Sequence, residues 1–184
     1  MRKAYLDIET SYVGPYSDQR LFRDVRNHRI TVIGIRIVDG DQDHLIQLVG
    51  EDATRENLMR ALQDVGSIVT YNGRSIPDSV RGYVGFDFPV IAAQLGVVLD
   101  KEFKHIDLCP ECWKAGLSGG QKAIEFTLGL KRKLPGKDGA WADKTWKEYE
   151  AGKDERRLNE LLAYNKEDVL MLGAIEKALK SRTR

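Results

Sequence analysis

Apolar positions in the first fifty residues alternate with polar ones, with the period of two that is typical of half-buried β-strands. This pattern predicts a first strand over residues 3–8. Ile30–Val38 is rich in β-branched residues, Asp39-Gly40 is a hairpin turn sequence, and His44–Val49 predicts the returning strand. The three strands together predict a meander. The polar residues 11–29 predict a loop with a short helical turn.

Beyond residue 50 the apolar positions change to helical spacing, interrupted by short strands. Asp52 or Thr54 caps a predicted helix that runs to about Val65, and Ser67–Tyr71 predicts a strand. Because a helix between two strands makes a crossover, this strand is expected to lie parallel to the first. The other predicted elements are a loop over 74–85, a helix over Phe86–Gln94, a strand over Lys104–Leu108, a helix over 121–129, a basic loop over Lys131–Gly139, and a helix in two segments over Asp154–Lys180.

This order of elements resembles that of the ribonuclease H-like fold. It predicts an α/β protein with a mixed five-stranded sheet, in which an antiparallel meander is extended by parallel strands and helices flank both faces. The 184 residues are 42% hydrophobic, so we expect residues 1–184 to form one domain with a sizeable core. There is no apolar run of about 18 residues and no signal-peptide pattern at the N-terminus, so we expect a cytoplasmic protein without a membrane span.

Overall charge and cysteine content constrain function weakly. The net charge is +1, whereas nucleic-acid binders are often more basic; an acidic metal site balanced by basic surface elsewhere would also sum to near zero. Cys109 and Cys112 form one Cys-x-x-Cys pair, and no second pair completes a structural zinc site. Incidental cysteines are the favoured interpretation, with a metal or redox role as the alternatives.

Two acids follow the apolar start of the first predicted strand, Asp7 and Glu9. Side chains alternate between the faces of a strand, so both carboxylates are expected on the same face. At about 4 Å and an effective dielectric constant of about 20, their repulsion is roughly 4 kcal/mol, which calls for a nearby positive charge. The alternative is an edge strand whose solvent face carries two acids.

Two further acids lie where this fold can bring them to the same place. Asp87 begins a helix after a strand and turn that are expected beside the first strand; an acid that stabilises a helix N-terminus is the alternative explanation. Tyr164 and Asp168 are spaced i, i+4 and share a helix face with Leu161 and Leu172. Asp168 is therefore expected to point inward, where a carboxylate needs a partner such as a shared cation.

Four converging carboxylates, Asp7, Glu9, Asp87 and Asp168, would be unstable without cations. Ligation by oxygen alone suits Mg²⁺ or Mn²⁺. Two such ions about 3.5–4 Å apart stabilise both the attacking and the leaving oxygen of a phosphoryl displacement. Tyr164 is then expected to hydrogen-bond the attacking water, and it is a candidate to take the water's proton.

Three motifs in this order resemble those of the DEDD superfamily of 3′→5′ exonucleases, in its tyrosine-bearing DEDDy branch. They are Asp7-Ile8-Glu9-Thr10, Asn72-Gly73 with Phe86-Asp87, and Tyr164 with Asp168. The resemblance covers nearly the whole chain, and within that branch the chain looks like the stand-alone bacterial domains described as predicted 3′–5′ exonucleases. The resemblance implies release of nucleoside 5′-monophosphates from single-stranded or frayed 3′ ends of nucleic acid, with two Mg²⁺ or Mn²⁺ ions.

The resemblance also implies a role for each motif residue. Asp7, Glu9 and Asp168 would hold the ion that activates water. Asp7 would bridge to a second ion, which Asp87 supports through water. Thr10 and Glu9 would contact the terminal nucleotide.

The chain departs from the family pattern in one place. About ten residues, 76–85, separate Asn72-Gly73 from Phe86-Asp87, which makes the role of Asn72 near the substrate less certain. Arg81 and Tyr83 in this insertion suit a clamp on a nucleic-acid strand, through phosphate pairing and base stacking; a tolerated surface insertion is equally compatible. The basic run Lys131-Arg132-Lys133 either follows the nucleic-acid backbone or forms a solvated loop.

Two other functions fit the same fold. One is a structure-specific endonuclease, and the other is a nucleic-acid-binding or scaffold domain without activity. The retention of all four acids and Tyr164 favours an enzyme. The sequence leaves open whether DNA or RNA is the substrate, because discrimination depends on contacts to the 2′-hydroxyl. Protein partners and oligomeric state are also left open.

Overall fold

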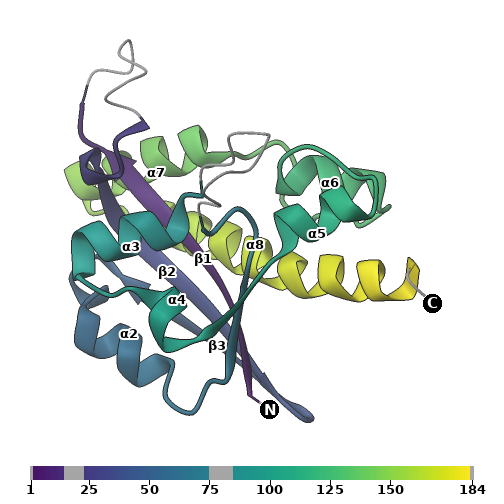
Figure 1. Ribbon diagram of the computed structural model, residues 1–184. Helices are drawn as coiled ribbons and strands as arrows, with labels where there is room; N and C mark the ends of the chain where they lie inside the picture. Colours follow the sequence, from purple (N-terminus) through teal and green to yellow (C-terminus); the bar gives the residue numbers. More distant parts are fainter. Residues whose placement is uncertain (1, 15–22, 75–84, 183–184) are drawn as a thin grey trace.

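A mixed five-stranded sheet forms the centre of the part of the chain that the structure, a computed structural model, describes: residues 2–14, 23–74 and 85–182. The strands lie in the order β3-β2-β1-β4-β5 (Figure 1). β1–β2 and β2–β3 are antiparallel, whereas β4 is parallel to β1 and β5 to β4. The predicted meander, crossover and ribonuclease H-like order are thereby confirmed. The bounds are β1 Lys3–Tyr12, β2 His28–Asp39, β3 Gln42–Val49, β4 Ser67–Thr70 and β5 Lys104–Asp107.

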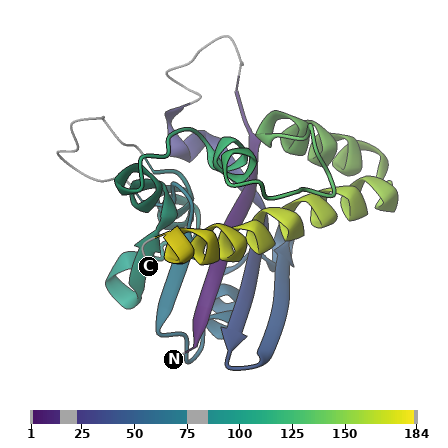
Figure 2. The same ribbon diagram turned by 90° about the vertical axis from the view of Figure 1, so that its right-hand side faces the viewer.

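Helices cover both faces of the sheet, as predicted (Figures 1 and 2). One face carries α2 Arg55–Ala61, α3 Asp87–Leu95 and α4 Leu99–Glu102; the other carries α5 Leu108–Lys114, α6 Gln121–Thr127, α7 Gly139–Gly152 and α8 Glu155–Arg182. Two short 3-10 turns, Val25–Asn27 and Gly50–Asp52, lie beside the meander. In Figure 2 the long helix α8 crosses the sheet in front of β1 and β2. None of the described helices is both long and apolar enough to cross a lipid bilayer.

The alternation along β1 divides its side chains between two cores. Ala4, Leu6 and Ile8 pack into the cluster beneath α2, α3 and α4. Tyr5 packs into the cluster beneath α5, α6 and α8. Asp7 has the same parity as Tyr5, so β1 directs its acids to the face that α8 covers.

Several predicted boundaries are wrong. β1 continues to Tyr12 and β2 begins at His28, so the loop between them is shorter than predicted. α2 ends at Ala61 rather than near Val65, and neither α5 nor α7 was expected.

The last predicted helix is continuous rather than divided into two segments. α8 spans 28 residues and contains no proline. Its single glycine, Gly173, lies where the helix approaches the sheet: a Cβ there would come within 2.5 Å of Arg36 Nη1. Gly173 therefore allows α8 to pack closely against the sheet, and it does not interrupt the helix.

The C-terminal half of α8 is fixed to β1 by a buried polar network around Glu176. Its carboxylate accepts hydrogen bonds from Lys3 (2.7 Å), Tyr5 (2.6 Å) and Lys180 (2.8 Å). Burial alone would raise the pKa of Glu176, but the bonds from Lys180, Lys3 and Tyr5 outweigh it and lower the pKa to about 2. The carboxylate therefore stays ionised and holds the helix across the sheet.

Candidate active site

Strand β1 places Asp7 and Glu9 on the face beneath α8. Glu9 is buried and Asp7 is half-buried, so neither is an acid on a solvent-exposed strand face. A register shift between Glu9 and Thr10 marks a β-bulge directly after the two acids. The edge-strand alternative therefore fails, since β1 is also central in the sheet.

A close approach between α8 and β2 brings the second pair of site residues to β1. Gly34 lies opposite Asp7 in the register, and Asn165 packs directly on Gly34, where any Cβ would overlap the Asn165 side chain. The Asn165 amide accepts a hydrogen bond from Gln47 (2.9 Å) and donates one to the Asp7 carboxylate (3.2 Å). The neighbouring Tyr164 then faces the acids, and sequence reasoning had assigned no role to Asn165.

Asp87 reaches the site from the opposite side, at the start of α3. The backbone N–H of Phe86 donates to the Asn72 carbonyl (2.8 Å), and that of Phe88 donates to the Gly73 carbonyl (2.8 Å). These two bonds hold the residues on either side of Asp87 against the end of β4. Asn72 thus has a backbone role in positioning Asp87.

The Asn72-Gly73 turn is itself held by Asp107, the last residue of β5. One carboxylate oxygen accepts from the N–H groups of Asn72 (2.9 Å) and Cys109 (3.0 Å). The other accepts from Gly73 (2.9 Å) and Arg74 (3.2 Å). Four backbone donors therefore converge on one carboxylate, which links β5 to the loop that carries Asp87.

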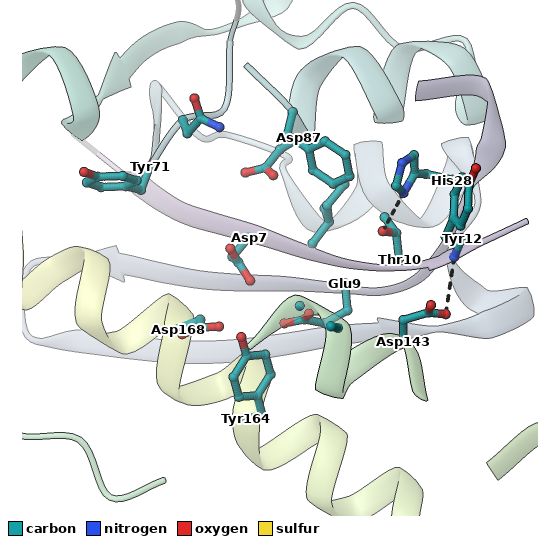
Figure 3. A pocket seen from close by; sticks show the side chains of 15 residues that line it. Asp7, Glu9, Thr10, Tyr12, His28, Tyr71, Asp87, Asp143, Tyr164 and Asp168 are labelled. Atoms are coloured by element: carbon teal, nitrogen blue, oxygen red, sulfur yellow. Dashed lines mark hydrogen bonds between the residues drawn. The ribbon is translucent and has the colours of Figure 1, made fainter. Parts of the chain in front are cut away.

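The acids converge in one pocket (Figure 3). Ligand oxygens of Asp7, Glu9 and Asp168 all lie within 4.8 Å of one another. Asp87 lines the same pocket, as does Tyr164, and the cavity has a volume of about 440 Å³. The five residues predicted as catalytic are therefore brought together from β1, α3 and α8.

Burial and the charges of neighbouring acids strongly shift the pKa values of the acids in this pocket. Burial, followed by the charge of Asp168, raises the pKa of Asp7 well above its usual range; burial and then Asp7 do the same to Glu9. Burial and the charge of Asp7 also raise the pKa of Asp87. Lys122 offsets part of this effect at Asp7 and Glu9. The described protein groups therefore compensate the burial and mutual repulsion of Asp7, Glu9 and Asp87 only in part.

Two buried carboxylate oxygens of the pocket, Glu9 Oε1 and Asp87 Oδ2, have no hydrogen-bond partner among the described residues. A buried acceptor without a partner is costly, and a bound cation removes that cost. The donor set consists of oxygen alone, which fits Mg²⁺ or Mn²⁺ rather than zinc. Of the described residues, Asp7, Glu9 and Asp168 are the group suited to holding a metal ion.

The basic run after α6 does not form a uniformly solvated loop. Arg132 is buried and forms ion pairs with Glu125 (2.5 Å) and with Asp168. Buried Glu167 accepts hydrogen bonds from the backbone N–H groups of Lys133 and Leu134, which fixes the loop on α8. The structure therefore places Arg132 behind a candidate metal ligand.

Of the other residues predicted to bind substrate, one lines the pocket, one lies on the exposed surface of the basic loop, and two are outside the described residues. Lys131 is exposed on the same loop. Thr10 lines the pocket, and its hydroxyl lies 3.3 Å from His28 Nδ1. Arg81 and Tyr83 lie outside the described residues, so the proposed clamp stays a prediction.

The pocket also has a wall that sequence reasoning missed. Gly139, Ala140 and Asp143 of α7 line it; buried Asp143 accepts hydrogen bonds from the hydroxyl of Ser11 (3.0 Å) and the backbone N–H of Tyr12 (3.3 Å). The available signal was helical spacing of Trp141, Trp146 and Tyr149 after Asp138, which caps the helix. Recognising that helix would have placed Asp143 on its buried face.

Other pocket residues have aromatic rings. His28 contacts Tyr12 and Phe86, with ring centroids 5.3 Å and 5.0 Å apart. All three line the cavity beside Thr10. Away from this pocket, Cys109 and Cys112 are both buried and form no disulfide, and neither belongs to the acidic group suited to a metal.

A five-stranded mixed sheet in this order, with acids gathered on its central strand and on a crossing helix, defines a ribonuclease H-like protein. Comparison with known families agrees: the model of the RNase H superfamily matches residues 4–180. The chain therefore belongs to this superfamily, which supports a nucleic-acid hydrolase as its general class. Among curated proteins, no sequence matches the chain significantly.

Proposed function

We propose that the protein is a metal-dependent 3′→5′ exonuclease of the DEDDy kind, which releases nucleoside 5′-monophosphates from single-stranded or frayed 3′ ends. One observation carries the proposal: Asp7, Glu9 and Asp168 present ligand oxygens within 4.8 Å of one another, in a pocket that Tyr164 also lines. This arrangement matches the acid and tyrosine motifs that the sequence shares with that branch. The match with the RNase H superfamily supports a phosphodiester substrate.

Asp7, Glu9 and Asp168 would hold one Mg²⁺ or Mn²⁺, and Asp7 with Asp87 would support a second. Bound there, the ions would activate water and stabilise the charge that develops on the phosphate. The unpartnered oxygens of Glu9 and Asp87 supply the free acceptors that such binding requires. Arg132 would keep Asp168 oriented, since it forms an ion pair with that carboxylate and does not itself line the pocket.

Tyr164 acts in this proposal as a hydrogen-bond donor that orients the attacking water. Its hydroxyl oxygen already accepts a hydrogen bond from Lys122 (2.5 Å). Burial, and then the negative charges of Glu9 and Asp168, raise the pKa of Tyr164 above its usual range. A protonated phenol donates a hydrogen bond, so we assign Tyr164 the role of orienting the water rather than that of taking its proton.

The direct test combines metal binding with nuclease assays on a 3′-labelled linear strand, in DNA and in RNA form. Asp7→Asn and Asp168→Asn should each abolish release of mononucleotides, and should weaken Mn²⁺ binding measured by calorimetry at least about tenfold. Asp64→Asn is the matched control, because Asp64 is an exposed carboxylate beyond the end of α2 and far from the acid motifs in the sequence. A 3′-blocked strand should resist degradation.

Two results would refute the proposal in different ways. Cleavage of a circular single strand, which has no 3′ end, would identify an endonuclease. Absence of Mn²⁺ binding, with and without oligonucleotide, would favour a binding or scaffold domain.

A further inference from the structure

We propose that Lys122 is a further catalytic residue, whose ammonium group binds a non-bridging oxygen of the scissile phosphate. This inference rests on the proposed nuclease function. Lys122 lies on α6, outside the acid and tyrosine motifs. Its place in the structure, and not its place in the sequence, connects it with the reaction.

The ammonium group of Lys122 lies at the hydroxyl of Tyr164. Lys122 Nζ is 2.5 Å from Tyr164 Oη and 4.6 Å from the centroid of the tyrosine ring. A water oriented by that hydroxyl attacks a phosphorus about 3–3.5 Å away. A non-bridging oxygen of the same phosphate therefore comes within reach of the Lys122 side chain.

The ammonium group of Lys122 also has N–H donors that form no hydrogen bond with the described residues. An ammonium group carries three N–H donors, and among the described residues one hydrogen bond is formed, to Tyr164. No carboxylate of the described residues lies within ion-pair distance of Lys122 Nζ, and the side chain is half-buried. A cation with two available donors at the edge of an acidic pocket is suited to a phosphate oxygen.

The second cation of this region cannot take the same role. The Arg132 guanidinium is buried and is engaged by Glu125 and Asp168. Neither Arg132 nor Lys122 lines the cavity itself, but Lys122 contacts Tyr164, which does. The charge of Arg132 is paired with Glu125 and Asp168, whereas Lys122 forms no ion pair among the described residues and contacts Tyr164.

The helix that carries Lys122 is fixed against α8. The Gln121 side-chain amide donates to Glu125 (3.0 Å) and to the backbone carbonyl of Asp168 (3.0 Å). Lys122 is therefore presented from a position that is tied to a candidate metal ligand. Such preorganisation is what a catalytic charge requires.

The repulsion between the phosphate and the acids of the pocket also favours a contact between Lys122 and the substrate. The phosphate that must enter the pocket is an anion, and the pocket already holds four carboxylates. A positive group that touches the phosphate directly offsets their repulsion and favours the phosphate's position beside Tyr164.

The test compares Lys122→Met with Lys122→Arg, each alone and in a Tyr164→Phe background, on a linear oligonucleotide with Mg²⁺. Lys122→Met should lower kcat/KM by about 10²-fold, mostly through kcat, while Lys122→Arg keeps most of the activity. Lys101→Met, an exposed lysine on α4, is the matched control and should leave kcat/KM unchanged. In the Tyr164→Phe background, Lys122→Met should still cost about tenfold or more, because the phosphate contact is separate from the phenol.

Binding of Mn²⁺ by calorimetry provides a readout that does not depend on turnover. Removing a cation from beside the acids should leave Mn²⁺ affinity unchanged or raise it. A tenfold fall in affinity would mean that Lys122 acts through the metal ligands. No further loss in the Tyr164→Phe background would mean that it acts only through the tyrosine, and either result overturns the proposal.

The outcomes also separate this inference from the function on which it rests. If the wild-type protein releases no mononucleotides under any of these conditions, the proposed nuclease function fails. If the wild type is active and Lys122→Met is equally active, the function stands and the role of Lys122 is refuted.

Discussion

Gly34→Ala tests the packing contact that places the site residues of α8 beside β1. Gly34 lies opposite Asp7, and a Cβ there would overlap the Asn165 amide oxygen. The same Cβ would lie 2.8 Å from Val169 Cγ2 and 2.9 Å from Asn165 Cγ, whereas ordinary contacts begin near 3.4 Å. The helix must therefore move away from β2 by about 0.6 Å for the valine alone, and further for the amide.

The magnitude of the effect follows from two separate losses. Overpacking of a well-packed interface costs about 1–3 kcal/mol. Displacement of Asn165 also weakens its bonds to Gln47 and Asp7, worth about 1 kcal/mol each. Against this, alanine in a strand gains about 0.5–1 kcal/mol over glycine. We expect Gly34→Ala to lower the free energy of unfolding by about 2–4 kcal/mol.

Function should suffer more than stability, because the displaced helix carries Tyr164 and Asp168. A shift of about 1 Å in reacting groups can cost roughly 10²-fold in rate. We expect nuclease activity to fall by about that factor and Mn²⁺ affinity to fall with it. Urea unfolding, calorimetry and the oligonucleotide assay measure the three quantities on the same protein.

Gly152→Ala is the control for loss of a glycine. Gly152 ends α7, and a Cβ there would meet no atom within 4 Å. That variant should be as stable as the wild type or slightly more stable. If Gly34→Ala is likewise within about 0.5 kcal/mol of the wild type and keeps its Mn²⁺ affinity, the close approach of α8 does not set the site geometry.

Two further predictions concern single carboxylates. Glu176 has a folded-state pKa of about 2 against an ordinary 4.5, so its stabilising contribution is complete above pH 4.5 and is lost as the pH falls toward 2. Allowing for solvent screening, Glu176→Gln should lower the free energy of unfolding by about 1–2 kcal/mol at pH 7. In urea unfolding near pH 2, where the folded-state carboxylate is partly protonated, the difference from the wild type should be much smaller. Asp107→Asn turns an NH₂ group toward two backbone N–H donors in either amide orientation, so it should cost about 1–3 kcal/mol and loosen the loop that carries Asp87. Unchanged thermal stability and unchanged nuclease activity in Asp107→Asn would contradict this role.

The strands and the acids could be predicted because both follow local rules. The period of two places Asp7 and Glu9 on one face of a strand without knowledge of what covers that face. The spacing i, i+4 places Tyr164 and Asp168 on one face of a helix in the same way. Crossover geometry then brings the two elements together, and the structure agrees. For the strands, only the boundaries, which depend on long-range pairing, were misjudged.

The basic residues could not be predicted in this way, because exposure is a tertiary property. In the sequence, Arg132 stands in a run of three cations that suits a solvated loop. In the structure, Glu125 and Asp168 enclose it, although they lie 7 and 36 positions away along the chain. No periodicity links residues at such separations, so the charge run gave no sign that one member is buried.

The carboxylates of this site can be found from sequence spacing, whereas its cations cannot. The acids must gather at one point, because only their convergence creates a cation site, and so their positions leave a pattern in strand and helix spacing. A cation that offsets them needs only to lie nearby, and any element that reaches the pocket can supply it. Here α6 supplies Lys122 and the following loop supplies Arg132, from a segment that carries none of the acid motifs. Sequence motifs therefore locate the metal ligands of such a site, whereas the groups that meet the substrate's charge must be found from the packing of α6 against α8.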